Sequence, residues 1–308
     1  MKKILILGGS GFVGTNLISK IIKNKNNKIY ATYFKNKKFK RFKNVKYLKG
    51  NLLNLKFCKS ITKNIDEVYM CAAYTAGANI INKNPLKFVF DNSIMNLNVL
   101  ESSAENQVKK FIFLSSSIVY PDSKKKMKEN DVNYTFFKKY HNVSWMKIYT
   151  EKISEVYAKK MKILIIRPAN LYGPFDKFDP SVAKVIPSLI YKFENYQKVE
   201  VWGNGKEIKD FLFIEDFIEI LLKLKNKIKK FDIINVASGQ QIKIKDLVEK
   251  IKSNYPRKKL VFLTNKPTMI SVRKIDTLKL NKLIKFKFKF NINDGIKKTI
   301  NWYRENLI

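Results

Sequence analysis

The N-terminal end of the chain constrains the fold more than any other segment. Ile4 to Leu7 form a short apolar run that suits a strand buried on both faces. Gly8, Gly11 and Gly14 follow at three-residue spacing, and residues 15–22 have the pattern of a helix. Backbone that lacks Cβ atoms can approach a phosphate closely, and the N–H groups at a helix N-terminus point at the anion. The segment therefore predicts a pyrophosphate-binding turn, with an ordinary strand-to-helix turn as the alternative.

Strand-like and helix-like segments alternate through the first half of the chain. We expect strands at 28–34, 45–48, 67–72, 110–114 and 163–166, and long helices at 85–105 and 143–161. This alternation predicts an α/β fold, a Rossmann-type doubly wound parallel sheet with helices on both faces. Ligands bind such sheets beyond the carboxyl ends of the strands. The glycine turn, Cys71-Ala72-Ala73, Ser115-Ser116-Ser117 and Arg167-Pro168 all fall at such ends.

The second half of the chain is less regular. Prolines and glycines break it into loops and short elements after residue 167, and a strand at 232–236 follows a helix at 216–224. We predict a dinucleotide-binding domain over residues 1–167, with residues 212–240 rejoining its sheet. Residues 168–308 are expected to form mainly a smaller substrate-binding lobe.

The composition argues against several classes of function. The formal net charge is +37, yet only five of the 62 basic residues are arginine and the lysines spread along the whole chain. We therefore expect no specific nucleic-acid binding. No apolar stretch is long enough to cross a bilayer, which predicts a cytoplasmic protein without a membrane partner. Two cysteines and one histidine, without metal-ligand spacing, predict no metal site.

A set of motifs points to a known family. The set comprises Gly8-x-x-Gly11-x-x-Gly14, Asn51-Leu52, Ala72-Ala73, residues 115–120, Lys147 and residues 167–174. With these motifs the chain resembles the extended short-chain dehydrogenase/reductases, which include nucleotide-sugar epimerases, dehydratases and reductases. Residues 170–180, 185–187, 201–205 and 209–216 are most similar to members that epimerise and reduce a 4-keto GDP-sugar. The resemblance implies a nicotinamide cofactor and a nucleoside-diphosphate sugar as substrate, resembling GDP-4-keto-6-deoxymannose.

The resemblance also implies catalytic residues, and the chain departs from the family there. Ser116 corresponds to the hydroxyl that binds the reacting oxygen, and Lys147 to the lysine that holds the nicotinamide ribose. The family's proton-donating tyrosine stands four residues before that lysine, where this chain has Val143. Ile118 replaces a cysteine and Lys184 a histidine that serve epimerisation in the most similar members. The epimerising half of the reaction is therefore in doubt.

Three interpretations of the missing tyrosine stay open. Another group, Tyr140 or Lys184, supplies the proton; Tyr140 could equally be a packing or surface aromatic. Alternatively, the protein is a non-catalytic or weakly active nucleotide-sugar or dinucleotide binder. As a third interpretation, Tyr134 and Lys138 form the tyrosine–lysine pair in a shifted register.

The remaining site residues follow from the end of the second strand and from the resemblance. Residues 32–38 contain no acid to accept the ribose hydroxyls of NAD but contain several lysines, which favours NADP, with NAD as the alternative. The predicted cofactor residues are Gly8, Gly11, Phe12, Val13, Gly14, Lys35, Asn51, Leu52, Ala72, Ala73, Lys147 and Asn170. The predicted substrate residues are Asn170, Lys192, Trp202, Lys209 and Arg273. By resemblance, helices 85–105 and 143–161 are expected to pair in a homodimer.

Overall fold

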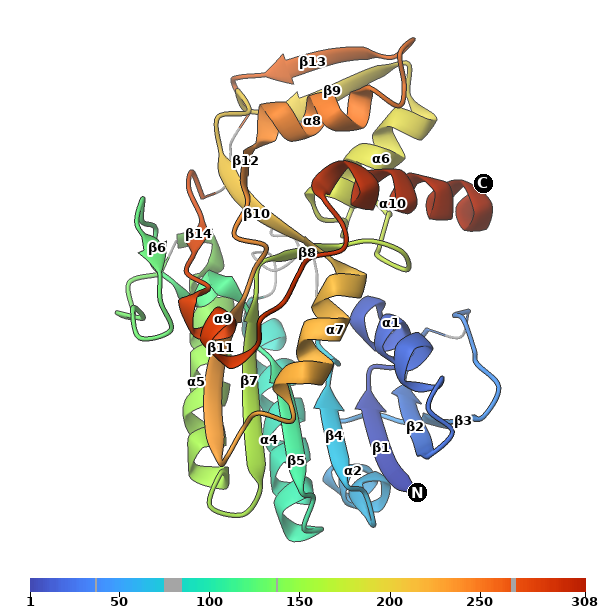
Figure 1. The fold of residues 1–308 in the computed structure, drawn as a ribbon, viewed down its shortest axis with the longest axis vertical. Coiled ribbons are helices and arrows are strands. Elements are labelled where there is room, and N and C mark those ends of the chain that lie inside the picture. Colours follow the sequence, from blue (N-terminus) through green and yellow to red (C-terminus); the bar gives the residue numbers. More distant parts are fainter. Residues whose placement is uncertain (37, 75–84, 137, 267–269) are drawn as a thin grey trace.

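A computed structural model describes residues 1–36, 38–74, 85–136, 138–266 and 270–308. Figure 1 shows a sheet flanked by helices in the lower half and a smaller lobe above it. The lobe lies beyond the carboxyl ends of the sheet strands, so the two parts enclose the edge where the sequence predicts ligand binding.

Seven parallel strands form the main sheet within the described residues, in the order β11-β7-β5-β4-β1-β2-β3. Their bounds are β1 (Lys2–Leu7), β2 (Asn27–Tyr33), β3 (Val45–Lys49), β4 (Glu67–Met70), β5 (Lys110–Leu114), β7 (Lys162–Pro168) and β11 (Phe231–Val236). The predicted doubly wound sheet is confirmed. The chain leaves β1 toward β2 on one side and continues from β4 on the other, which places the topological switch point beside the glycine turn.

Helices cover both faces of this sheet (Figure 1). One face carries α1 (Phe12–Ile21), α7 (Ile214–Leu224) and α9 (Leu278–Leu283), and the other carries α2 (Leu55–Thr62), α4 (Pro85–Glu105) and α5 (His141–Tyr157). Alternate strand residues supply the two cores: Ile4 and Ile6 face the α1 side, and Leu5 and Leu7 face the α4 side. The helix predicted at 143–161 ends earlier, because β7 begins at Lys162 and the chain must reverse before it.

Within the described residues, the upper lobe contains short sheets and three helices. Its strands are β8 (Asn170–Tyr172), β10 (Ile208–Phe213) and β12 (Gln241–Lys243) in one sheet, and β9 (Lys198–Trp202) with β13 (Lys259–Leu263) in another. Its helices are α6 (Val185–Asn195), α8 (Ile244–Lys252) and α10 (Ile292–Leu307). Phe193, Val199, Leu247 and Ile300 belong to a separate apolar core that holds these elements together.

Short elements join the lobe to the sheet. They are the strand pair β6 (Lys126–Met127) and β14 (Lys274–Ile275), and the 3₁₀ helices η1 (Ser117–Val119) and η2 (Lys138–Tyr140). The chain crosses between the two parts more than once, since β11 pairs with β7 in the main sheet after β10 has paired with β8 in the lobe. Among the helices that the structure describes, none has the length and apolar character needed to cross a bilayer.

Candidate functional site

The glycine turn after β1 forms a cradle that side chains would fill. Gly8 has a φ of +79°, and a Cβ there would lie 2.8 Å from the backbone of Ala72. A Cβ on Gly14 would lie 2.3 Å from the carbonyl oxygen of Gly8. Gly11 precedes α1 and offers no side-chain cap, so the N–H groups of the first helical turn remain available to an anion. The residues therefore fit the pyrophosphate of a dinucleotide.

The other predicted cofactor residues lie along the same edge of the sheet. Phe12 and Val13 form the first turn of α1, and Ala72 and Ala73 follow β4 beside the glycine turn. The side chain of Asn51 accepts a hydrogen bond from the Leu53 amide at 3.1 Å, within a turn after β3. Leu52, in that turn, is buried in the core, and Lys35 is exposed after β2.

Ser116 and Lys147 both lie near the carboxyl end of β5. Ser116 is half-buried and caps η1, with its Oγ accepting a hydrogen bond from the Ile118 amide at 3.3 Å. The Lys147 ammonium donates to the carbonyl oxygen of Leu114 at 2.8 Å. Burial lowers the pKa of Lys147 to about 8, against the opposing effect of Glu151. The hydroxyl and the ammonium predicted from the resemblance thus lie next to the same strand end.

An apolar cluster contains the residues that stand where the resemblance implies proton-transfer groups. Val143 is 8% exposed and packs in a cluster with Phe88 and Met146, and Ile118 packs against that cluster. Val143 and Ile118, which replace the expected tyrosine and cysteine, therefore belong to one patch in space. Val143 and Ile118 are compatible in packing, because both side chains are hydrocarbon and lie in the same cluster.

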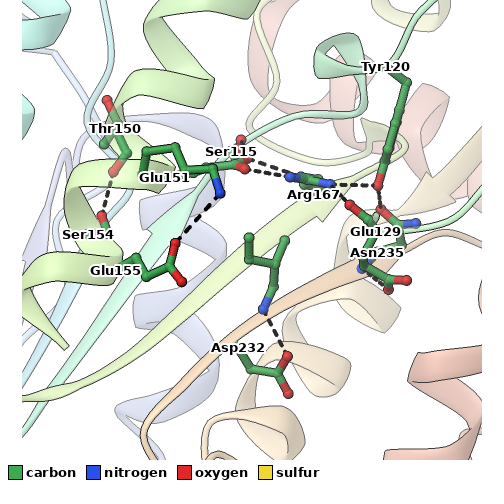
Figure 2. Close-up of polar contacts among 12 residues, drawn as sticks. Ser115, Tyr120, Glu129, Thr150, Glu151, Ser154, Glu155, Arg167, Asp232 and Asn235 are labelled. Carbon is green, nitrogen blue, oxygen red and sulfur yellow. Dashed lines mark hydrogen bonds and ion pairs between the residues drawn. The ribbon is translucent and has the colours of Figure 1, made fainter. Parts of the chain in front are cut away.

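A buried polar network anchors the strand ends beneath this site (Figure 2). Arg167 at the end of β7 donates to both carboxylate oxygens of Glu151 on α5, at 3.1 and 2.6 Å, and Ser115 donates to the same carboxylate. Arg167 also donates to the Tyr120 hydroxyl at 2.9 Å, and that hydroxyl donates to Asn235 of β11 at 2.6 Å. Burial raises the pKa of Tyr120 to about 12, so its phenol stays neutral. The network fixes β5, β7, β11 and α5 relative to one another.

Sequence reasoning missed this network. One signal was available: Glu151 stands one helical turn after Lys147, so a carboxylate continues the face of α5 that turns toward the sheet. The pairing with Arg167 needed the three-dimensional structure, because the two residues lie on different elements.

Two predicted substrate residues form a buried cationic group below the lobe. Arg273 is 4% exposed and donates to the carbonyl oxygens of Tyr120 and Pro121, while its Nη2 has no hydrogen-bond partner among the described residues. Lys209 on β10 donates to the carbonyl oxygen of Ile270. Burial and then the neighbouring Arg273 lower the pKa of Lys209 to about 8. The negative charge of Asp122 acts on both cations and that of Glu207 on Lys209, so the chain itself balances part of their charge, while Arg273 Nη2 is left without an acceptor.

The other predicted substrate residues lie on β8, α6 and β9 of the lobe. The Asn170 amide on β8 donates to the carbonyl oxygen of Asp210 on β10 at 2.9 Å. The Lys192 ammonium on α6 donates to the carbonyl oxygen of Glu200 on β9 at 2.8 Å. Trp202 ends β9 and is 50% exposed. Lys192 and Trp202 thus lie on adjoining elements, on the α6–β9 side of the lobe.

Tyr140 lies at the start of α5, as its N-cap residue. Burial raises the pKa of Tyr140, and the positive charge of Arg273 opposes this rise. The phenol is therefore near the cationic group, one helical turn before Val143. Tyr134 lies outside the helices with a φ of +64° and stacks on Trp145, so its spacing to Lys138 places the two on no common helix face.

Lys184 reaches the first turn of α1 from the N-cap of α6. Its ammonium lies 5.4 Å from the centre of the Phe12 ring. Burial raises the pKa of the Asp176 carboxyl group, and the positive charge of Lys184 opposes this rise. Asp176 Oδ2 has no hydrogen-bond partner within the part of the chain described. Lys184 and the buried carboxylate therefore stand at the end of α1 that carries the glycine cradle.

Comparison with known proteins identifies a matching family and several similar proteins. The model of the NAD dependent epimerase/dehydratase family matches residues 4–237. GDP-L-fucose synthase from Escherichia coli (strain K12) is 29% identical over 264 residues, 80% of this chain and 82% of the relative. GDP-mannose 3,5-epimerase 1 from Oryza sativa subsp. indica is 25% identical over 316 residues, 99% of this chain and 82% of the relative. UDP-glucose 4-epimerase from Thermotoga maritima, solved with UDP-glucose, superimposes with a TM-score of 0.89 at 21% identity, over 99% of this chain and 100% of that structure.

Proposed function

Since this chain belongs to the NAD-dependent epimerase/dehydratase family, we propose that it epimerises or reduces a 4-keto nucleoside-diphosphate sugar with NADP(H). The similarity to GDP-L-fucose synthase and GDP-mannose 3,5-epimerase supports GDP as the nucleotide and a reaction similar to that of GDP-L-fucose synthase. The absence of an acid at residues 32–38 supports NADP over NAD.

The unpartnered Nη2 of Arg273 is the observation that carries the substrate proposal. The guanidinium is 4% exposed and lies beside Lys209; Asp122 supplies part of the opposing charge, and the open Nη2 donor favours a further anion. A diphosphate has the charge and the acceptor oxygens to meet both cations. We assign Arg273 and Lys209 to the diphosphate, and Asn170, Lys192 and Trp202 to the rest of the nucleotide sugar.

Ser116 and Lys147 have distinct roles in the proposed reduction. A nicotinamide cofactor, when bound, would supply the hydride for the carbonyl carbon. The Ser116 hydroxyl donates a hydrogen bond to the carbonyl oxygen and so stabilises the negative charge that develops there. The Lys147 ammonium, which donates to Leu114 at 2.8 Å, holds the ribose hydroxyls at the carboxyl end of β5. A proton must then reach the oxygen, and Val143 has none to give.

Tyr140 and Lys184 are the proposed proton donors. The phenol of Tyr140 lies one helical turn from Val143; burial raises its pKa, and the positive charge of Arg273 opposes this rise. Lys184 lies beside Phe12 at the glycine cradle and near the Asp176 carboxylate. Tyr140→Phe and Lys184→Ala separate the two, because the variant that lacks the donor loses kcat while its binding of the nucleotide is retained.

Binding of GDP, measured by calorimetry, tests the substrate site directly. Arg273→Ala is expected to weaken GDP binding about tenfold or more, since it removes a charge-assisted contact to phosphate. Arg257→Ala removes an exposed arginine elsewhere and is the matched control. Equal effects of the two substitutions would contradict the assignment of Arg273.

The apolar cluster around Val143 favours a second function, a nucleotide-sugar or dinucleotide binder without turnover. Val143 and Ile118, where the resemblance implies proton-transfer groups, both have hydrocarbon side chains in that cluster. The second function predicts that NADPH and GDP bind but that no 4-keto GDP-sugar is reduced. The first function predicts NADPH oxidation with at least one such sugar.

We further propose a cytoplasmic homodimer that pairs through α4 and α5. Exposed apolar side chains stand on both helices: Leu86 (83% exposed), Phe90 (63%), Tyr149 (46%) and Val156 (60%). Burying such a surface in a partner removes apolar area from water. Light scattering should give twice the chain mass of 36.1 kDa, and a monomer would contradict the proposal.

A further inference from the structure

A cavity of about 450 Å³ opens in the upper lobe, apart from the residues assigned above. Its walls come from β8, β10, β12, α8 and the segment that leads from α9 to α10, which rises beside β10 in Figure 1. As far as the chain is described, no residue assigned to the cofactor, the substrate or catalysis lines this cavity. Its volume lies within the range of small-molecule sites, about 300–1,000 Å³. The cavity therefore has room for a ligand of its own.

Aromatic rings form the apolar wall of the cavity. Phe211 and Phe213 stand two residues apart on β10, so their rings share one face of the strand. The ring centre of Phe213 lies 4.6 Å from that of Phe290 and 5.5 Å from that of Tyr172. These four rings line the cavity together with Phe288. Aromatic rings favour contact with a further ring, edge to face or offset, so this wall suits an aromatic ligand.

The part of the wall before α10 is held in place by the chain itself. Lysine and phenylalanine alternate over residues 285–290, where the lysines are exposed and the phenylalanines half-buried. This period of two is that of an extended segment with its rings turned inward. The Asp216 carboxylate on α7 accepts the amides of Lys289 and Phe290 at 3.1 and 3.2 Å. The rings are therefore fixed without a ligand, which lowers the cost of binding one.

Four polar side chains of the lining have no partners of their own. The side chains of Gln240, Gln241, Asp246 and Lys250 make no hydrogen bond or ion pair to another residue that the structure describes. Asp246 and Lys250 stand four residues apart on α8, a spacing at which opposite charges commonly pair. Since they do not pair with each other, a carboxylate and an ammonium both remain open to a ligand.

The charged pair and the aromatic wall together define a chemical class. The Cβ atoms of residues four apart on a helix are about 5–6 Å from each other, so Asp246 and Lys250 can both reach charged groups that share one ligand carbon. The carboxylate attracts a cation, the ammonium attracts an anion, and the wall accepts a ring. An amino acid with an aromatic side chain carries all three groups within that span.

We propose that the cavity binds an aromatic amino acid as a free small molecule. Its ring packs against Phe213 and Phe290, its ammonium lies at Asp246 and its carboxylate at Lys250. The inference goes beyond the proposed function and does not depend on it.

Calorimetry with the full chain tests the inference. The probes are L-phenylalanine and L-tryptophan, with three molecules that each lack one group: 3-phenylpropionate without the ammonium, phenethylamine without the carboxylate and L-alanine without the ring. Each of the three should bind at least about tenfold more weakly than L-phenylalanine, because each loses one contact. Wild type that binds neither aromatic amino acid would overturn the inference.

Substitutions on α8 locate the two charged contacts. Asp246→Asn should weaken L-phenylalanine binding by about tenfold and leave 3-phenylpropionate within about twofold. Lys250→Gln should weaken L-phenylalanine similarly and leave phenethylamine within about twofold. Glu249→Gln is the matched control, because Glu249 is an exposed carboxylate on the same helix that does not line the cavity. Equal effects of Asp246→Asn and Glu249→Gln would overturn the assignment.

A substitution in β12 and a competition experiment test the location. Ile242 lines the cavity, so Ile242→Trp should fill part of it and abolish binding of L-phenylalanine by a protein whose circular dichroism is unchanged. Excess GDP should not displace L-phenylalanine, since the predicted substrate residues lie outside the lining. Retained binding in Ile242→Trp, or displacement by GDP, would overturn the separate site.

Discussion

The buried ion pair between Glu151 and Arg167 allows a stability prediction from the structure alone. The two side chains are 2% and 3% exposed, and two contacts of 3.1 and 2.6 Å join them (Figure 2). Glu151→Gln keeps the shape of the side chain and removes its charge. The Arg167 guanidinium then remains buried without a compensating anion.

The size of the effect follows from that geometry. Removing one partner of a buried ion pair costs about 3–5 kcal/mol. Glutamine keeps one hydrogen-bond acceptor, so we expect a loss near the lower end, about 3 kcal/mol. At the usual unfolding entropy per residue, such a loss lowers Tm by roughly 5 °C in a chain of this length.

Urea unfolding followed by circular dichroism measures this loss. Glu155→Gln on the same helix is the matched control, because the pair of Glu155 with Lys152 spans 3.6 Å with side chains 57% and 63% exposed. The control should lose less than about 1 kcal/mol. Similar small losses in both variants would refute the argument that the buried network holds the strand ends together.

Three further predictions concern the site. Val143→Tyr places a phenol one helical turn before Lys147 and should raise kcat of NADPH-dependent reduction by about 100-fold. Val143→Phe adds a ring without a proton to donate and should leave kcat unchanged, so equal rates of the two variants would contradict the role of a proton donor. Burial lowers the pKa of Lys147 to about 8, so its charge is lost as pH rises through that value; NADPH affinity should fall above it, and an affinity independent of pH would count against the ammonium. Gly14→Ala puts a Cβ 2.3 Å from the Gly8 carbonyl oxygen and should weaken NADPH binding by about tenfold or more in a folded protein; unchanged binding would mean that the turn is not the cradle.

The sequence predicted the sheet well because its signals are local. Apolar β-runs and the glycine spacing lie within short segments, and the strands appear within a few residues of their expected bounds. Gly8 could also be predicted from the local sequence, because it belongs to the glycine spacing that marks the turn. A Cβ at this position would lie against the backbone of Ala72.

The features that decide the chemistry depend on contacts between distant residues. Val143 and Ile118 are 25 positions apart in sequence, and only the structure brings them into one apolar cluster. The rings of Tyr33, Phe39 and Tyr47, which surround Arg41, come from two strands and the loop between them. Neither grouping repeats with a helix or strand period, so no pattern along the chain could predict it.

NADPH oxidation with 4-keto GDP-sugars is the measurement that tests the central claim most directly. The account predicts turnover by the purified protein with at least one such sugar, faster with NADPH than with NADH, and lost in Ser116→Ala. Binding of NADPH and GDP without oxidation of NADPH by any 4-keto sugar would contradict the catalytic claim and favour the non-catalytic binder.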